Sequence, residues 1–426
     1  MLYELWRNLA ASRPNQPALC DLASGRQWTF GGLWSAGERR RLDSAAAVFP
    51  RGHSPEFIFD LLAAWRENKV VCPLEPGQSP PEFPAPPSPC VHLKCTSGTA
   101  GQPRFVAFTP AQLQADAANI VATMGLRPDW PNLGVISLAH SYGFSNLVLP
   151  LLLHGIPLLL APAPLPEIVR RAADDQIAIT LAAVPAMWRA WHDARAIPPN
   201  LRLAISAGAP LPVDLETDVF KSSGLKIHNF LGASECGGIA YDASAAPRND
   251  SALAGAPLPN VTLSLNPDGC LTVHSAAVAE TYWPDKSASL GGGNFHTSDL
   301  AELTDGVVYL RGRLGDQINV AGRKVSPETI ERALLAHPRV RECLVFGAPT
   351  HKAERTEMVV AVVVSDAREG ELRRFLLRTL PAWQVPRHWR FVEKLQSNSR
   401  GKLSRAAWRD EFVRSVTNVA AGVSRL

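Results

Sequence analysis

The stretch Lys94–Val106, KCTSGTAGQPRFV, holds three hydroxyl side chains and two glycines within six positions. Hydroxyl groups and unobstructed backbone N–H groups are donors that bind phosphate oxygens, which predicts an anion-binding loop between a strand and a helix. The alternative is an ordinary turn, because serine, threonine and glycine are frequent in turns and no G-K-[ST] sequence completes a Walker A loop. The residues that would contact phosphate are Thr96, Ser97, Gly98, Thr99 and Gly101.

The length and composition predict a folded protein of two domains. The chain has 426 residues, of which 46% are apolar and 19% charged, values typical of globular domains. Its longest apolar segment, Leu147–Pro166, is interrupted by prolines and a histidine, so we expect a core helix and a buried strand there rather than a span of ~20 residues through a bilayer. Without a signal-peptide pattern, a cytoplasmic protein with no membrane partner is expected. The seven cysteines form no C-x-x-C pair and are expected to be reduced and mostly buried.

Charge is distributed unevenly along the chain. The net charge is +4, but residues 316–426 contain 20 Lys and Arg against 12 Asp and Glu, a balance of +8, and the remainder carries −4. A basic C-terminal part suits a polyanionic partner, while a solvated basic face with no partner is the alternative. We expect no nucleic-acid partner.

Alternating strand and helix patterns predict an α/β fold. Eight prolines between Pro73 and Pro89 exclude a helix or central strand there, so an extended connector leads into the phosphate-loop candidate. Strand patterns then alternate with helix patterns up to residue 232, which predicts mainly parallel sheets with flanking helices. Residues 252–310 have the short alternating strands of a β-rich subdomain, and residues 316–426 predict a small α+β domain. The helices expected after capping or proline signals include 56–68, 110–125, 165–176, 327–338 and 368–381.

Seven segments resemble, in order and approximate spacing, the motifs of the adenylate-forming superfamily of acyl-CoA synthetases, aryl-acid ligases and peptide-synthetase adenylation domains. They are LKCTSGTAGQPR (93–104), LAHSYGF (138–144), ISAGAPLP (205–212), FLGASECGG (230–238), HTSDLAEL (296–303), YLRGRLGDQINVAGRKVSPETIE (309–331) and SRGKLSR (399–405). The resemblance covers nearly the whole chain. It implies a large adenylation domain over residues 1–314 and a small mobile C-terminal domain over 315–426, with an N-terminal region shorter than usual.

The resemblance implies that a carboxylate attacks the α-phosphorus of MgATP to give an acyl-adenylate and pyrophosphate, after which a thiol takes the acyl group. Lys402 would bridge the incoming carboxylate and the α-phosphate, and Glu235 would bind Mg²⁺. The small domain would rotate about Gly315, and the thiol would be coenzyme A or the phosphopantetheine of an acyl carrier protein. The residues that match nucleotide-binding positions are the five loop residues above with Arg104, Gly208, Ala209, Pro210, Phe230, Leu231, Gly232, Ser234, Asp299 and Arg313. Among these, the resemblance implies adenine contacts for the Gly208–Pro210 turn and for Phe230 or Leu231, ribose contacts for Asp299, and ribose or phosphate contacts for Arg313.

A further set of residues would form the pocket for the acid. It comprises His140, which would also serve catalysis, with Ser141, Phe144, Gly232, Gly237 and Gly238. A histidine in the core, satisfied by a backbone carbonyl, is the alternative for His140. The HSYGFSN segment lacks the aspartate by which related domains bind an α-amino group. It resembles the corresponding segment of aryl-acid and coumarate-type ligases, which implies a small aromatic or similarly flat carboxylic acid as substrate.

Two other functions remain open at this stage. One is an amino-acid adenylation domain that serves a peptidyl carrier protein, which the missing aspartate disfavours. The other is a catalytically silent nucleotide-binding relative, suggested by the short N-terminal region, by Leu231 in place of an aromatic residue and by Ser298 in place of a glycine. Joint retention of four motif residues disfavours the silent relative; they are Glu235, Asp299, Arg313 and Lys402.

Overall fold

The computed structural model describes residues 1–43, 45–82, 84–85, 88–96, 104–174, 177–350, 357–396 and 404–423. Contacts divide the chain into two compact units. The larger unit comprises Met1–Asn266, Thr272–Thr297 and Leu303–Tyr309, and the smaller comprises Pro267–Leu271, Ser298–Glu302 and Leu310–Leu426. The predicted large and small domains are therefore present, while a functional boundary after residue 314 stays a prediction.

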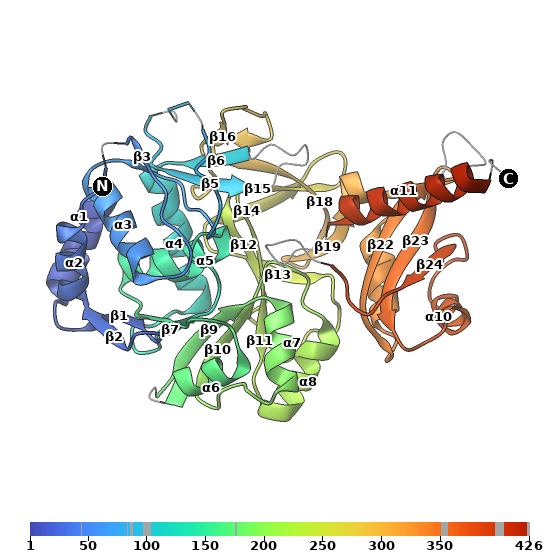
Figure 1. Cartoon of the computed structure of the whole chain (residues 1–426), viewed down its shortest axis with the longest axis horizontal. Coiled ribbons are helices and arrows are strands. Elements are labelled where there is room, and N and C mark those ends of the chain that lie inside the picture. The colour runs from blue at the N-terminus through green and yellow to red at the C-terminus, as the bar shows by residue number, and fades with distance from the viewer. Residues whose placement is uncertain are drawn as a thin grey trace. The chain divides into compact units, whose positions relative to one another are not determined.

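The main sheet joins a parallel block to an antiparallel one (Figure 1). Its order in the described residues is β14-β15-β18-β19-β13-β12-β11-β10-β9-β7-β8-β1-β2, with β17 paired to β18. The strands are β1 (Pro17–Asp21), β2 (Arg26–Thr29), β7 (Asn132–Gly134), β8 (Leu158–Leu160), β9 (Ile179–Ala183), β10 (Leu201–Ser206), β11 (Ile227–Ala233), β12 (Gly237–Tyr241), β13 (Leu253–Pro257), β14 (Val261–Leu265), β15 (Cys270–Ser275), β17 (Leu290–Gly291), β18 (Asn294–Thr304) and β19 (Val307–Arg313). The run from β11 to β1 is parallel, as the alternating helices and strands predict, whereas β11, β12, β13 and β19 pair antiparallel.

A second sheet carries the phosphate-loop candidate. It has the order β16-β6-β5-β4-β3 and consists of β3 (Ala47–Val48), β4 (Val70–Val71), β5 (His92–Thr96), β6 (Arg104–Phe108) and β16 (Thr281–Trp283). The expectation of a loop between a strand and a helix is wrong, because β5 and β6 are antiparallel neighbours and the next helix begins only at Pro110. The apolar run Phe105–Phe108 forms a strand between the loop and that helix.

Helices cover these sheets in the larger unit. They are α1 (Leu2–Ser12), α2 (Phe30–Arg39), α3 (Pro55–Arg66), α4 (Pro110–Met124), α5 (Ser141–Gly143), the π-helical turns η1 (Phe144–Val148) and η2 (Pro150–His154), α6 (Pro166–Asp174), α7 (Pro185–Asp193) and α8 (Val213–Ser223). Thr109 and Gln112 form a capping box at the start of α4, and Gly125 ends it in the left-handed conformation. The core helix predicted after Leu147 is present as π-helical turns, next to Pro150, which cannot donate a backbone hydrogen bond. Ser54 precedes α3 as expected but makes no side-chain cap.

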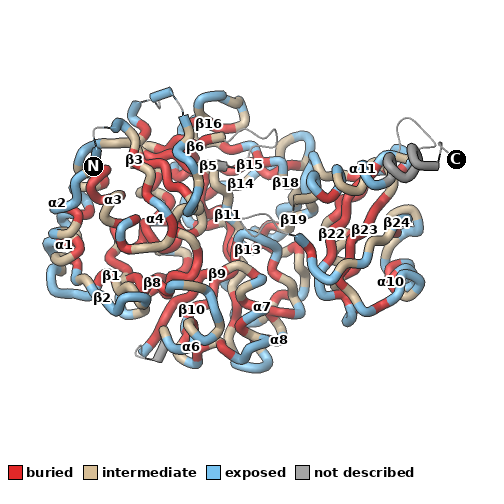
Figure 2. Tube along the Cα trace, viewed as in Figure 1, coloured by how far each residue is buried: buried red, intermediate tan, exposed pale blue. Residues whose placement is uncertain are grey.

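Burial explains the pattern of the parallel strands. All five residues of β9 are buried, as a strand covered on both faces requires (Figure 2). Trp188 and Trp191 of α7 are fully buried, and their rings meet edge to face at 5.2 Å. Trp188 Nε1 also donates to the carbonyl of Ile205 at 3.2 Å, so this core contacts the end of β10, the strand that precedes the candidate turn at Gly208.

The smaller unit has the predicted α+β pattern. Its three-stranded sheet has the order β22-β23-β24, and a hairpin of β20 and β21 precedes it. Its elements are the 3₁₀ turn η3 (Leu314–Asp316), β20 (Ile318–Val320), β21 (Arg323–Val325), α9 (Pro327–Leu335), β22 (Val340–Pro349), β23 (Glu357–Ser365), α10 (Glu369–Leu376), β24 (His388–Phe391) and α11 (Arg405–Val423). Val345 and Val363 pack with Leu372 on one side of the sheet, while Phe346 packs with Trp408 on the other, so alternate residues of the strands serve two cores.

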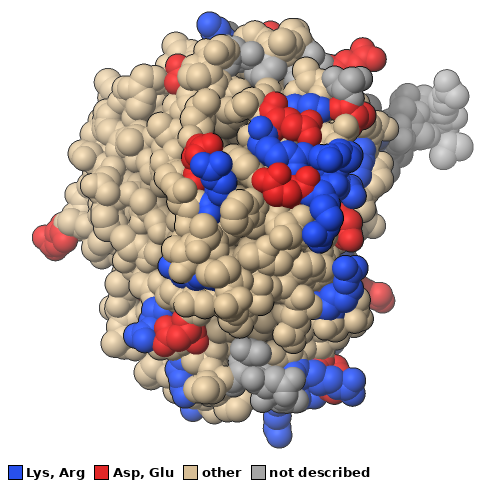
Figure 3. All heavy atoms as spheres, turned by 90° about the vertical axis from the view of Figure 1, so that its left-hand side faces the viewer, with Lys and Arg blue, Asp and Glu red and all other residues tan. Residues whose placement is uncertain are grey.

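The charged surface of α2 and α3 is mixed in sign. Arg40 pairs with Asp60 at 2.6 Å, and Arg66 pairs with Glu67 at 2.8 Å. Figure 3 views the side on which these helices lie and shows lysines and arginines interspersed with acidic residues. Within the described residues, no helix combines the length and hydropathy needed to cross a membrane.

Candidate active site

The phosphate-loop candidate begins and ends on paired residues. Thr96, the last residue of β5, lies opposite Arg104, the first residue of β6. Ser97, Gly98, Thr99 and Gly101 lie outside the described residues, as does Lys402. The structure therefore describes where this loop is anchored, and the phosphate contacts of the loop remain predictions.

Tyr282 connects the end of that loop to the predicted magnesium ligand. The Arg104 guanidinium lies 3.8 Å from the centroid of the Tyr282 ring, and the Tyr282 hydroxyl donates a hydrogen bond to Glu235 Oε1 at 3.1 Å. Burial and the negative charge of Glu235 raise the pKa of Tyr282, so its hydroxyl keeps the proton that it donates. A cation and a carboxylate from distant segments thus meet on one aromatic side chain.

Glu235 occupies the turn between β11 and β12. Ala233 pairs with Gly237 across this turn, and the backbone N–H of Ala279 donates to the carbonyl of Glu235 at 2.8 Å. The side chain is half-buried. Within the described residues no three His, Cys, Asp or Glu side chains form a metal-binding group. A single carboxylate fits Mg²⁺ that arrives with a nucleotide, because this cation takes one or two carboxylates and completes its shell with phosphate oxygens and water.

The predicted adenine-binding residues follow β10 and lie on β11. Gly208 has φ of +83°, which favours glycine, and the turn that it forms with Ala209 and Pro210 is exposed. Phe230 is buried and lies 6.3 Å from Tyr142, between ring centroids, whereas Leu231 is half-buried. Successive strand residues point to opposite faces, so Phe230 and Leu231 do not share a side of β11. Gly232 is exposed and Ser234 is half-buried.

His140 has a carboxylate neighbour that the sequence did not indicate. Its Nε2 lies 3.2 Å from Glu75 Oε1, and the Ser137 hydroxyl donates to the same oxygen at 2.5 Å. The His140 side chain is 42% exposed. It therefore differs from the expected alternative of a buried core histidine, and it immediately precedes half-buried Ser141 at the start of α5.

The other predicted acid-pocket residues surround a buried polar network. The Lys94 ammonium donates to Ser145 Oγ at 3.3 Å, Ser145 Oγ donates to Asp116 Oδ2 at 2.6 Å, and Asp116 Oδ1 accepts from the backbone N–H of Gly238 at 3.2 Å. A Cβ atom on Gly237 would lie 1.9 Å from Asp116 Oδ1, and Gly237 also has φ of +68°, so only glycine fits. Phe144, next to Ser145, is fully buried.

The predicted ribose-binding pair is formed within the smaller unit. Arg313 Nε donates to Asp299 Oδ1 at 2.8 Å, with the Arg313 side chain 63% exposed. Two residues later, Gly315 lies in η3, and a Cβ atom built there meets no atom within 4 Å. The predicted hinge position is therefore free of steric constraint from the described residues around it.

Arg405 binds three carboxylates near the predicted catalytic lysine in sequence. It lies 2.9 Å from Asp316, 2.8 Å from Glu328 and 2.7 Å from Glu331. Burial raises the pKa of Glu331, against the lowering effect of Arg405. The chain three residues beyond Lys402 is thus held to η3 and α9.

Sequence comparisons assign this geometry to a family. Residues 67–283 match the family model described as AMP-binding enzyme, and residues 329–402 match that of the AMP-binding enzyme C-terminal domain. The chain belongs to the AMP-binding enzyme family. It is an adenylate-forming enzyme of the AMP-forming acid–thiol ligase class, as the seven motifs predict.

Relatives of this AMP-binding enzyme include ligases whose names state the acid on which they act. Feruloyl-CoA synthase from an Amycolatopsis species is 28% identical over 397 residues, which cover 87% of this chain and 80% of the relative. A Mycobacterium tuberculosis protein named "Probable 2-succinylbenzoate--CoA ligase" is 30% identical over 332 residues, which cover 73% of this chain and 82% of the relative.

Solved structures confirm the fold of the AMP-binding enzyme. ATP-bound MatB from Rhodopseudomonas palustris superposes with a TM-score of 0.85 at 19% identity, covering 97% of this chain and 99% of that chain. O-succinylbenzoate coenzyme A synthetase (MenE) from Bacillus subtilis, in complex with AMP, gives a TM-score of 0.80 at 20% identity, covering 94% and 97%. The predicted fold class is correct.

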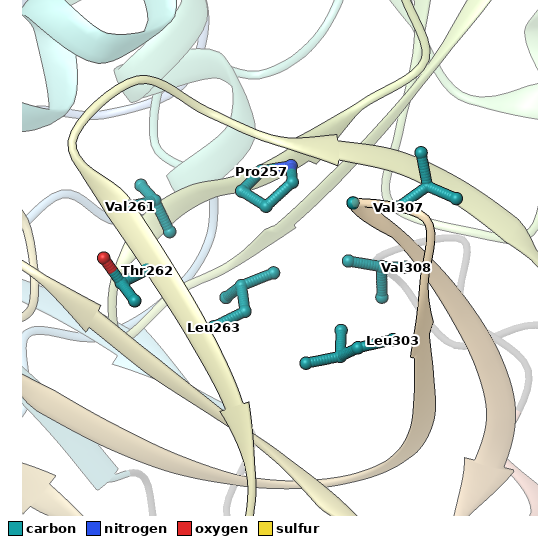
Figure 4. A pocket seen from close by; sticks show the side chains of 8 residues that line it. Pro257, Val261, Thr262, Leu263, Leu303, Val307 and Val308 are labelled. Atoms are coloured by element: carbon teal, nitrogen blue, oxygen red, sulfur yellow. The ribbon is translucent and has the colours of Figure 1, made fainter.

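A hollow of about 290 Å³ lies apart from these residues in the AMP-binding enzyme. It is bordered by β13, β14 and the β18–β19 turn, and apolar side chains such as Val261, Leu263 and Val308 point into it (Figure 4). The residues that line it include no predicted site residue within the described part of the chain. Thr262 is the one lining residue with a polar side chain, so the hollow has no charged group to bind nucleotide phosphates.

Proposed function

We propose that this AMP-binding enzyme activates an aromatic carboxylic acid with ATP and transfers the acyl group to coenzyme A. The observation that carries the proposal is the contact of Tyr282 with both Arg104 and Glu235. This contact brings together a cation at the end of the phosphate-loop candidate and the carboxylate proposed to bind magnesium. The reaction needs such an arrangement, because a carboxylate and a polyphosphate, both anionic, must be held together.

The residues have distinct roles in this proposal. The segment after Thr96 binds the β- and γ-phosphates, Arg104 adds positive charge, and Lys402 stabilises the charge that develops as the carboxylate attacks the α-phosphorus. Glu235 holds Mg²⁺, which neutralises phosphate charge when it is bound. Tyr282 orients the Glu235 carboxylate by its hydrogen bond. Asp299 and Arg313 bind the ribose, and the turn at Gly208 supports the adenine.

Two features support an aromatic acid as the substrate. The segment His140–Asn146 contains no carboxylate to pair with an amino group, and aromatic rings lie next to it, with Phe144 stacked on His92 at 4.2 Å. Relatives named for feruloyl and 2-succinylbenzoyl thioesters agree with this choice. His140 would take part in binding this acid, and Glu75, 3.2 Å from His140 Nε2, would orient its ring.

The acceptor is proposed to be coenzyme A rather than a carrier protein. Residues 316–426 carry a net charge of +8, which suits the phosphates of coenzyme A. An acidic acyl carrier protein is the second candidate, favoured by the same charge. We infer a cytoplasmic enzyme, since both ATP and coenzyme A are found there.

Carboxylate-dependent ATP–pyrophosphate exchange tests the first half-reaction. We expect exchange with benzoates or cinnamates but with neither fatty acids nor amino acids. Lys402→Ala should abolish exchange and leave ATP binding intact, while Lys394→Ala, an exposed lysine of the same segment, should retain activity. Nucleotide binding without exchange for any acid would instead identify a silent relative.

Thioester formation then tests the acceptor. Purified enzyme, ATP and the accepted acid are incubated with coenzyme A or with a phosphopantetheinylated carrier protein, and the thioester is detected by mass. Product with the carrier protein alone would reverse the choice of acceptor.

A further inference from the structure

The buried lysine of β5 is not fully hydrogen-bonded. Lys94 is 4% exposed, yet among the described residues its three ammonium hydrogens have one hydrogen-bond acceptor, Ser145 Oγ at 3.3 Å. Its ammonium also lies 4.4 Å from the ring centroid of Phe108. The nearby carboxylate of Asp116 is engaged by Ser145 and by the backbone of Gly238. A buried ammonium with spare donors is costly unless another acceptor satisfies it.

A second unsatisfied polar side chain lies two residues earlier on the same strand. His92 is fully buried, and neither ring nitrogen has a hydrogen-bond partner among the described residues. Burial, reinforced by the Lys94 charge, lowers the pKa of His92 well below its usual value, so the ring is neutral and offers one donor and one acceptor. Residues i and i+2 of a strand share a face, so the unsatisfied hydrogen-bonding groups of His92 and Lys94 lie on one side of β5.

These two side chains contact a segment that is proposed to bind the acid. His92 stacks on Phe144, and Lys94 reaches the adjacent Ser145, both in η1. Through Asp116, the same network contacts Gly238, three residues after Glu235. Glu235 is half-buried whereas Lys94 is only 4% exposed, and this difference in burial is the reason for assigning Lys94 to the end of the acid that lies farthest from its carboxylate.

We propose that Lys94 and His92 are specificity-determining residues that bind a hydroxyl group at the far end of an aromatic acid substrate. A ring hydroxyl accepts a hydrogen bond from the Lys94 ammonium and donates one to the unprotonated nitrogen of His92. A carboxylate at the same place would accept hydrogen bonds from Lys94 and from the His92 N–H, but it would leave the unprotonated nitrogen of His92 without a donor. A hydroxyl supplies that donor and still accepts from Lys94. This inference rests on the proposed function, because it names the acid class within the same site.

The test compares acids that differ only at the ring substituent. Exchange kinetics are measured with benzoate, 4-hydroxybenzoate, 4-methoxybenzoate and terephthalate, with the 3-substituted isomers, and with the matching cinnamates. For the wild type we expect kcat/KM for the best hydroxy acid to exceed that of its unsubstituted parent by about tenfold or more, because a site built to bind a hydroxyl rejects the analogue that lacks it. A wild-type enzyme that prefers the unsubstituted or carboxylated acid overturns the inference without any variant.

Two variants assign the preference to individual side chains. Lys94→Met keeps the length of the side chain and removes the ammonium, and it should bring the hydroxy and unsubstituted acids to within about threefold, chiefly through KM. His92→Phe keeps the ring stack and should lower the preference for hydroxy over methoxy acids, since only the hydroxyl donates. Lys221→Met, at an exposed lysine of α8, is the matched control and should leave all ratios unchanged.

The outcomes separate this inference from the proposed function. Exchange that depends on the acid, with ratios unchanged in Lys94→Met and His92→Phe, overturns the roles of these two residues and leaves the proposed function standing. Failure of every acid with the wild type overturns both. Should one variant not fold in thermal unfolding measurements, the other variant and the wild-type series still decide.

Discussion

The Arg405 guanidinium lies 2.9 Å from the Asp316 carboxylate, which ties the residue three positions after Lys402 to the residue directly after Gly315. Because Glu328 and Glu331 also bind Arg405, one cation balances three carboxylates. We expect Arg405→Gln to lower the free energy of unfolding by about 2 kcal/mol, since partly buried carboxylates lose their counter-charge. Urea unfolding measures this loss. Arg409→Gln, which removes the exposed pair with Glu357, is the control and should cost much less.

The same variant should respond to pH. Burial raises the pKa of Glu331, so the folded state holds this proton more tightly than the unfolded state, whose pKa is near 4.5. The stability contributed in this way is present below pH 4.5 and is lost as pH rises through the folded-state pKa. Removing Arg405 raises that pKa further. The loss in Arg405→Gln should therefore be smaller at pH 5 than at pH 8, and an equal loss at both would contradict this account.

Tyr282 should act through Glu235. Tyr282→Phe removes the 3.1 Å hydrogen bond but keeps the ring under Arg104. We expect kcat to fall by about threefold to tenfold and the magnesium concentration for half-maximal rate to rise, whereas Glu235→Gln should cost about 100-fold or more. Magnesium titrations of exchange at fixed ATP check both. An unchanged magnesium requirement in Tyr282→Phe would exclude an orienting role for this tyrosine.

Gly237 is expected to tolerate no side chain. An added Cβ would meet Asp116 Oδ1 at 1.9 Å, and φ is +68°. Gly224 has a similar φ of +70° but no atom within 4 Å, so Gly224→Ala reports the backbone strain alone. We expect about 1 kcal/mol of destabilisation at Gly224 and more than about 3 kcal/mol at Gly237. Partial rescue of Gly237→Ala by Asp116→Ala would identify the overlap as the cause, and equal costs at the two glycines would refute it.

Two substitutions at Gly315 distinguish an effect on domain rotation from an effect on packing. Alanine fits there, because a Cβ meets no atom within 4 Å, so Gly315→Ala should keep both half-reactions near wild type. Gly315→Pro fixes φ and restricts Leu314, and we expect pyrophosphate exchange to persist while thioester formation falls by about tenfold or more. Equal losses in both half-reactions would argue against rotation about this residue.

A buried charge cluster around Lys226, the residue before β11, predicts that the free energy of unfolding depends on pH in the acid range. Lys226 pairs with Glu216 and with Asp242, the latter at 2.6 Å. Burial acts to raise the pKa of Asp242, but hydrogen bonds from Lys226 and Ser244 hold it below its usual 3.8, so its contribution to stability is present above pH 3.8 and lost below it. Lys226→Met should cost about 3–5 kcal/mol at pH 7 and less at pH 4, measured by denaturant unfolding. Arg189→Met, at an exposed pair with Asp214, should change little at either pH.

Much of the fold follows from sequence pattern because local signals agree there. Alternating helices and apolar strands predict the parallel block, and Thr109, Gln112 and Gly125 delimit α4 by capping chemistry that reads directly from the sequence. The sequence pattern did not predict β6, so the hairpin of β5 and β6 was missed. Only Thr109 separates β6 from α4, so no turn sequence marks where the strand ends and the helix begins. Its partner β16 lies far along the chain, and such pairing is set by tertiary contacts.

Some residues of the candidate site could be predicted from the sequence, and others could be found only in the structure. Glu235, Asp299 and Arg313 stand in recognisable motifs, and the structure brings the last two together. Tyr282 and Glu75 stand outside the seven motifs, and Lys94 stands in the first of them without an assigned role, because their importance depends on contacts between remote segments, as in the hydrogen bond from Gly238 to Asp116, 122 positions apart. The one signal in the sequence was a lysine in the apolar strand pattern that leads into the phosphate-loop candidate, since lysine is rarely enclosed without a partner.

The pairing of Thr96 with Arg104 has a consequence for how this enzyme can change. The ladder between β5 and β6 holds both ends of the intervening segment at the separation of neighbouring strands, so the entropy of closing that loop is met by the sheet rather than by the loop's own sequence. Each doubling of its length would then cost only about 0.6 kcal/mol. The β5–β6 ladder therefore keeps its register independently of the intervening sequence, and substitutions in that segment should alter phosphate binding without displacing the strands on either side.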